Sequence, residues 1–173
     1  PLYSSAASDV YKRQEGDDCQ RNAMSLLGIS LTDAKHYEDA LSVQEAELST
    51  LRRVGADLSS GLRADERNLL IVQGNLAGTY CELGRHEEAL RIERDIYARR
   101  SALLGKNDEA TLLSAVNLAC SLVEDLEQFD EARAFLQDRI PEAIQALGKD
   151  ADLALKLRRM YAQCLYENDG ASR

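Results

Sequence analysis

The sequence predicts an all-α fold made of stacked antiparallel helix pairs, and two observations lead to this prediction. Residues 75–105 contain two helical patterns of apolar residues, separated by a short turn at Gly84. Two amphipathic helices joined in this way form a helical hairpin. The stretch also recurs: the tripeptide Asn-Leu-Ala at Asn75 returns 42 residues later at Asn117, and the dipeptide Leu-Gly ending at Gly105 returns 43 residues later. Self-similarity at such a period indicates a solenoid of stacked repeats.

The copies on either side of this stretch differ from it in detail. Glu-Ala at Ala89 returns at Ala132, 43 residues later, so we place one extra residue in the turn of the downstream copy. A weaker copy lies upstream, because Ala-Leu at Ala40 precedes the Ala-Leu at Ala89 by 49 residues. In that register Gly28 is a small residue that allows two helices to approach closely.

These repeated residues also carry a family resemblance. In the copy that begins at Asn75, Tyr80 lies four residues after a packing leucine, Leu-Gly forms the turn, and Glu-Glu-Ala-Leu starts the second helix. The pattern resembles the tetratricopeptide repeat (TPR), in the longer form of about 42 residues found in kinesin light chains. The resemblance implies a right-handed, TPR-like α-solenoid of about three and a half repeats.

The predicted domain organisation follows from this register. Residues 1–16 have no helical period, and we expect a disordered, non-native head there; a native disordered N-terminus is the alternative. Residues 17–173 form one TPR-like helical repeat domain. Its repeats span approximately 17–55, 64–105, 106–148 and 149–173, and the last is incomplete. The chain is then either a fragment of a longer array or an array whose final helix is a cap.

Three places within the array need separate predictions. The loop over residues 55–63 is eight residues longer than its counterpart, and the surplus either extends the next helix, forms an edge loop or widens the angle between repeats. Pro141 predicts a kink or break near Ile140, because proline removes a backbone donor, or else it starts a separate short helix. The run Asn-Asp-Gly ending at Gly170 predicts a turn.

Composition and charge exclude several classes of function. The net charge of −9 argues against nucleic acid as a partner, since nucleic acids attract basic surfaces. No apolar run approaches the ~20 residues of a membrane span, and the N-terminus lacks the pattern of a secretory signal. The four cysteines are far apart in sequence, so we expect no metal site and read Cys81, Cys120 and Cys164 as small apolar residues. We therefore expect a cytoplasmic protein without a cofactor.

The resemblance implies that the first helix of each repeat lines a concave groove. There Asn75 and Asn117 are expected to hold the backbone of an extended peptide, because an amide offers both a donor and an acceptor. Alternatively, these amides bond between helices or are merely solvated. The first and fourth repeats depart from the pattern, with Leu26 and Met160 at the matching positions. The predicted peptide-binding residues are Ile71, Asn75, Gly78, Leu113, Val116, Asn117, Cys120, Lys156 and Arg159, and Asn22, Ser25, Ile29 and Asp33 are the groove positions of the first repeat.

Charge along the groove indicates which partners it suits. Lys156 and Arg159 share a helix face and are expected to receive an acidic residue or a C-terminal carboxylate, or else to form a solvated surface. Residues 105–147 contain three Lys or Arg and nine Asp or Glu. This acidic repeat suits a partner with basic and apolar residues, or simply keeps the protein soluble.

The sequence as a whole predicts a protein–protein interaction scaffold that binds a peptide or partner helix in its groove. No pattern supports catalysis, since His36 and His86 occupy equivalent turns and the glycines form no phosphate-binding loop. We therefore expect no enzyme activity. Two alternatives remain: a structural or self-associating repeat segment, and the regulatory TPR region of a larger signalling protein or enzyme.

Overall fold

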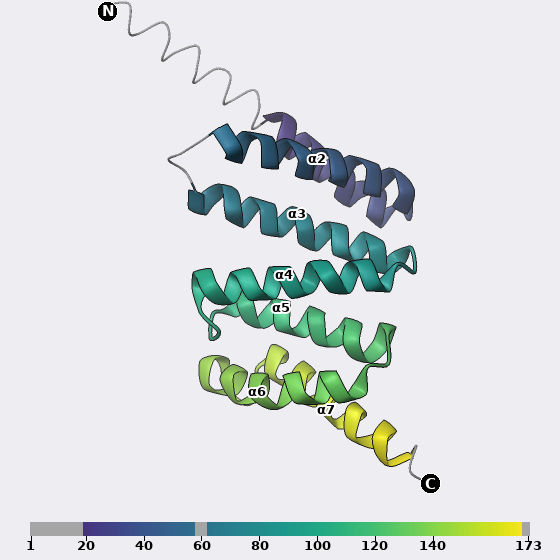
Figure 1. Cartoon of the computed structure of the whole chain (residues 1–173), viewed down its shortest axis with the longest axis vertical. Helices are drawn as coiled ribbons and strands as arrows, with labels where there is room; N and C mark the ends of the chain where they lie inside the picture. The colour runs from purple at the N-terminus through teal and green to yellow at the C-terminus, as the bar shows by residue number, and fades with distance from the viewer. Residues whose placement is uncertain (1–18, 58–61, 171–173) are drawn as a thin grey trace, which may run out of the picture. The chain divides into compact units, whose positions relative to one another are not determined.

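The computed structural model describes residues 19–57 and 62–170 (Figure 1). The disordered head predicted over residues 1–16 lies outside these ranges. The chain divides into two compact units, the N-terminal unit Pro1–Leu83 and the C-terminal unit Gly84–Arg173. The regular elements of the described residues are all helical, as predicted. None of the described helices combines the length and the apolarity needed to span a membrane.

The described residues of the N-terminal unit form three helices. Residues 19–33 are helical, and α2 (Tyr37–Asp57) and α3 (Leu62–Glu82) follow. In Figure 1, α2 and α3 run side by side, and they are in contact. A Cβ atom on Gly28 would lie 3.1 Å from Gln44 Cγ, so the helices approach closely here, as predicted, and a larger residue would require the Gln44 side chain to shift.

The C-terminal unit is built from α4 (His86–Leu104), α5 (Glu109–Cys120), the π-helical turn η1 (Ser121–Asp125), α6 (Phe129–Leu147) and α7 (Asp152–Gly170). Its core takes leucines from α4, α5, η1, α6 and α7, and all of them are at most 2% exposed: Leu90, Leu112, Leu122, Leu136 and Leu157. Burial of large aliphatic side chains at helical spacing is the main source of stability for this unit.

The helix boundaries have local causes in the sequence. The Asp108 carboxylate caps α5 by accepting a hydrogen bond from the Ala110 amide at 2.9 Å. Gly105 and Gly148 follow α4 and α6 with φ values of 89° and 95°, which L-residues with side chains rarely adopt. The repeated Leu-Gly pairs are therefore helix stops.

The extra residue of the third repeat lies in a helix and not in the turn, which corrects our prediction. The Leu126 amide bonds to the Ser121 carbonyl at 3.1 Å, a spacing of five residues that widens the end of the first helix into η1. The turn itself keeps one left-handed residue in each repeat, with φ of 63° at Lys35, 71° at Gly84 and 51° at Glu127. The repeats therefore share one turn geometry, and the helix accommodates the insertion.

Two further predictions are settled by helix length. Because α2 continues to Asp57 and α3 begins at Leu62, the surplus residues between the first two repeats extend helices. The turn predicted at Gly170 is wrong, since α7 continues to that residue. Each residue added to an existing helix gains a backbone hydrogen bond, which outweighs a local turn preference.

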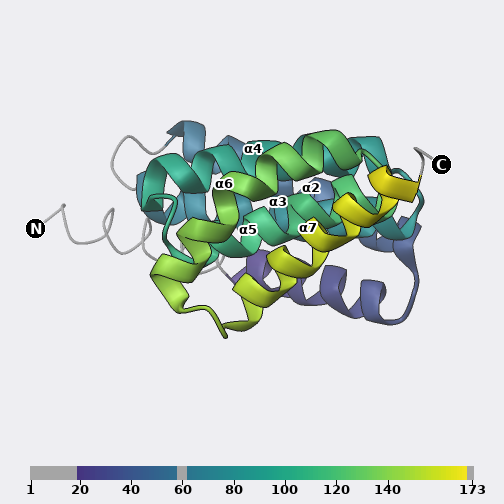
Figure 2. The ribbon, with the colours of Figure 1, turned by 90° about the horizontal axis from the view of Figure 1, so that it is seen from below.

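Pro141 lies within α6, which continues unbroken to Leu147. A break and a separate short helix are therefore both wrong. The proline ring is exposed, and Figure 2 shows that α6 changes direction along its length. A bend is the expected response of a helix that loses one backbone donor and must avoid a clash with the preceding turn.

Candidate interaction surface

One face of α3 carries the residues predicted for peptide binding in the second repeat. Ile71, Asn75 and Gly78 are spaced four and three residues apart and therefore share a helix face. The Ile71 side chain is 54% exposed, Asn75 is half-buried, and Gly78 is exposed with no heavy atom within 4 Å of a Cβ added there. Asn68, one turn before Ile71, extends the same exposed stripe.

A cavity of about 310 Å³ opens at the N-terminal end of this stripe, within the N-terminal unit. It is lined from all three helices of the unit, by Arg21, Asn22, Ser25, Glu47, Leu51, Asn68, Ile71 and Val72. Three residues predicted for the groove from sequence, Asn22, Ser25 and Ile71, therefore meet at one hollow.

Glu47 has an unusual environment in this cavity. It is only 3% exposed, and its carboxylate accepts a hydrogen bond from the Ser25 hydroxyl. Within residues 19–57 and 62–170 it has no other hydrogen-bond or ion-pair partner. A buried carboxylate can accept several hydrogen bonds, so most of its acceptor capacity is unused.

In the C-terminal unit, the predicted residues of α5 divide between surface and core. Leu113 is 45% exposed and Asn117 is exposed. Val116 is only 8% exposed and belongs to the hydrophobic core, so its side chain is not available to a ligand.

A short polar chain joins predicted residues of the third and fourth repeats. Cys120 donates to Glu124 Oε2 at 3.1 Å, and Arg159 Nη2 on α7 lies 3.3 Å from Glu124 Oε1. Lys156 is exposed one turn earlier on α7. The side chains of Arg159 and Glu124 are 73% and 43% exposed, so their ion pair contributes little stability and remains accessible to a competing partner.

The Cys120 thiol acts as a hydrogen-bond donor to the Glu124 carboxylate. Burial, followed by the hydrogen bond to Glu124, raises the pKa of its thiol to about 12. The thiolate is the reactive form of cysteine, and it is therefore scarce at neutral pH. The electrostatics of this surface give no support to cysteine chemistry.

The side-chain amides of Asn75 and Asn117 have no hydrogen-bond partner in the part of the chain that the structure describes. Of the alternatives open from sequence, bonding between adjacent helices is therefore not observed. Each amide keeps a free donor and a free acceptor at the same position of its repeat, as pairing with a peptide unit requires.

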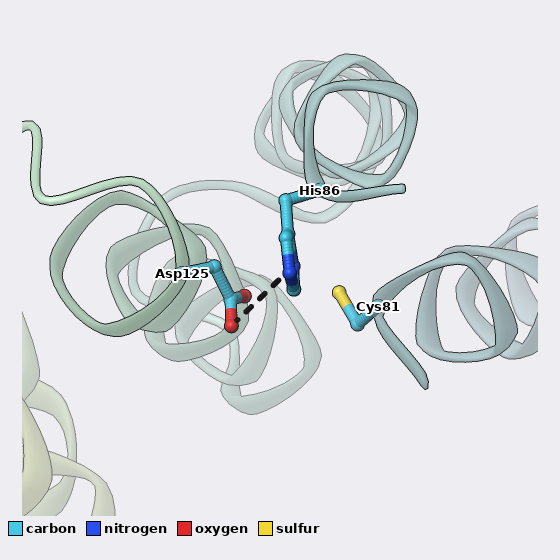
Figure 3. Close-up of side chains that lie close together, drawn as sticks. All are labelled: Cys81, His86 and Asp125. Atoms are coloured by element: carbon cyan, nitrogen blue, oxygen red, sulfur yellow. Dashed lines mark ion pairs between the residues drawn. The ribbon is translucent and has the colours of Figure 1, made fainter. Parts of the chain in front are cut away.

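His86 and its neighbours form a second polar group, inside the C-terminal unit. His86 Nδ1 lies 3.6 Å from Asp125 Oδ1, an ion pair only when the imidazole is protonated (Figure 3). Glu93, seven residues after His86 on α4, is 9% exposed, and burial raises its pKa, while a hydrogen bond with Ser121 acts in the opposite direction. Its Oε2 atom is buried without a partner.

Comparison with known proteins identifies the repeat. The family model of the tetratricopeptide repeat matches residues 68–141. This part of the chain is therefore similar to the tetratricopeptide repeat. No curated protein sequence gives a significant match.

Two solved structures share this TPR-like fold. Both are structures of a protein from Podosopora anserina that is described as a kinesin light chain with nearly identical TPR-like repeats. One of the two carries a single amino-acid substitution. They match with TM-scores of 0.68 for the substituted form and 0.67 for the other, each at 18% identity over 86% of this chain. This chain spans 66% of the length of each of them. The resemblance to TPR repeats of the kinesin light chain type is confirmed, and so is the all-α, TPR-like solenoid class.

Two residues of the TPR surface were missed by sequence reasoning. Asn68 precedes Asn75 by seven residues, a spacing that places both on one helix face and could have identified it. Glu47 lies on a second helix, which the family pattern assigns to the outer wall. Its position at the cavity depends on contacts among three helices, and no local sequence pattern indicates such contacts.

Proposed function

We propose that this chain is an interaction scaffold that binds an extended peptide or a partner helix along the exposed faces of its first helices. Tetratricopeptide repeats generally mediate protein–protein interactions, and solenoid repeats offer extended binding surfaces. The observation that supports a peptide ligand is the pair of unpartnered amides at Asn75 and Asn117. We assign the protein no catalytic role.

The proposed binding mode combines backbone recognition with apolar contacts. Within its own unit, each asparagine donates to a carbonyl and accepts from an N–H of a bound extended segment, which holds that segment without regard to its sequence. In the N-terminal unit the exposed Ile71 provides an apolar contact beside Asn75, and in the C-terminal unit the exposed Leu113 provides one beside Asn117. The polar chain ending at Arg159 supplies a charged group that selects among ligands. We further propose a cytoplasmic location, because the four cysteines are free thiols, as is usual in a reducing compartment.

Selection from a displayed library of random linear peptides tests this function. The full chain should enrich peptides that an unrelated helical protein does not retain. The double variant Asn75→Ala and Asn117→Ala should weaken the selected peptides at least about tenfold, as loss of hydrogen bonds at two sites predicts. Asn107→Ala is the matched control, since Asn107 is exposed in the loop before α5. Unchanged affinity in the double variant would exclude the asparagine clamp.

A further inference from the structure

The cavity in the N-terminal unit contains a buried carboxylate, Glu47, which peptide binding by asparagine side chains does not require. Glu47 lines it from α2, is 3% exposed and has the Ser25 hydroxyl as its partner in the described chain. A carboxylate at the base of a cavity can accept several hydrogen bonds and pair with a cation. With one hydroxyl donor as its partner, the Glu47 carboxylate keeps acceptor capacity for a cationic group that enters the cavity.

We propose that this cavity receives the lysine or arginine side chain of the bound partner segment, whose cationic head pairs with Glu47. The proposal rests on the proposed peptide-binding function and names the chemistry of the partner at one position.

The shape and composition of the cavity fit such a side chain. Its volume of about 310 Å³ is sufficient for a long side chain together with displaced water. Leu51 and Val72, which are 6% and 3% exposed, form an apolar wall against which the methylene stem packs. Asn22 and Asn68 on the rim offer amides to the peptide backbone on either side of the basic residue.

The neighbouring charges favour an organic cation over a metal ion. Glu47 is the only carboxylate among the described residues that line the cavity, whereas hard divalent cations need several oxygen ligands. Arg21 also lines the cavity and already takes part in another interaction of the protein. Selectivity for a basic side chain therefore depends on the depth of Glu47 and not on a strongly acidic rim.

The peptide library described above, panned against the full chain, tests the proposal. Peptides selected by the wild-type chain should share Lys or Arg at one position, and replacing that residue by norleucine should weaken binding at least about tenfold, as desolvated charge pairs predict. In the Glu47→Gln variant, which keeps the shape of the side chain, replacing the basic residue of the peptide by norleucine should leave the binding affinity unchanged. Ile71→Lys is a second variant that keeps the fold, because Ile71 is 54% exposed, and its ammonium group should compete for Glu47 and remove the preference.

The outcomes separate this inference from the proposed function. Selected peptides that depend on Asn75 and Asn117 but show no basic preference would overturn the inference alone. A basic preference that persists in both Glu47→Gln and Ile71→Lys would also overturn it. If no peptide is enriched above the unrelated protein, both proposals fail.

Discussion

The helices α4 and α6 are the second helices of two repeats, and each buries one ionisable side chain in a different environment. Both are 19 residues long, and they begin 43 residues apart in the same register. At one buried position α4 has Glu93 where α6 has Leu136, and at the next α4 has Ile96 where α6 has Arg139. Each helix therefore buries one ionisable side chain where the other buries an aliphatic one.

Arg139 is well compensated. Its guanidinium donates to the Tyr97 hydroxyl, and its carbon centre lies 5.8 Å from the Tyr97 ring centre and 5.7 Å from that of Phe135. Arg139 Nε and Glu142 Oε2 are 3.1 Å apart, although they are not aligned as a hydrogen bond, so we regard this contact as Coulombic. Asp138 adds a second carboxylate at 3.7 Å.

Glu93 is compensated poorly. Its partner Ser121 offers one hydroxyl, its Oε2 atom has no partner, and the nearby Asp125 carboxylate carries charge of the same sign. The comparison teaches that burial by itself does not decide the energetic effect of a charge. The partners supplied by neighbouring helices decide it.

The largest effect is expected from Arg139→Ala. This change leaves Glu142 with only its longer contact to Lys106, at 4.0 Å, and exposes the ring faces of Tyr97 and Phe135. The free energy of unfolding should therefore fall by about 3 kcal/mol. Chemical denaturation of the full chain measures it. Arg99→Ala is the control, since its exposed pair with Asp95 should contribute less than about 0.5 kcal/mol. Equal effects of the two substitutions would mean that burial of Arg139 is unimportant.

A change of opposite sign is expected from Glu93→Leu, which gives α4 the residue that α6 has at Leu136. Removing a buried, unpartnered oxygen should stabilise the protein at pH 7 by about 1–2 kcal/mol, as chemical denaturation would measure. A loss of stability would show that the single bond to Ser121 compensates Glu93 adequately.

The pH dependence of Glu93 follows from its raised pKa. Its contribution to stability is fully present below the unfolded pKa of about 4.3 and is lost as the pH rises through the higher folded pKa. The gain from Glu93→Gln should therefore be small at pH 4 and grow toward pH 7. A gain that does not change with pH would show that the Glu93 charge is not the cause.

The smallest effect is expected in the turns before the two helices. Gly84 before α4 has φ of 71°, and Glu127 before α6 has φ of 51°, a left-handed conformation that is costly for a residue with a side chain. Glu127→Gly should stabilise the protein by about 0.5 kcal/mol, because relief of strain exceeds the added entropy of the unfolded chain. Gly84→Glu should destabilise it, and thermal unfolding of both variants measures the contrast.

Much of the fold was predictable from residues that recur in register. The equivalence of Ala89 with Ala132 and of Gly105 with Gly148 is a local pattern, and both pairs occupy matching positions in the structure. The location of the extra residue was not predictable. A turn and a π-helical end both accommodate one residue, and the choice depends on how Leu122 and Val123 pack in the core of the C-terminal unit. The single repeat domain over residues 17–173 remains a prediction.

The sequence by itself determined that the chain is a series of helical hairpins of the tetratricopeptide type, because apolar spacing and helix stops act over a few residues and repeat. Only the tertiary structure decided which polar side chains lose their water. Glu47 faces a cavity because helices from three segments of the chain surround it, and Val116 is buried because neighbouring helices cover it. Burial is a property of the packed helices around a residue, so residues with the same register can have opposite environments.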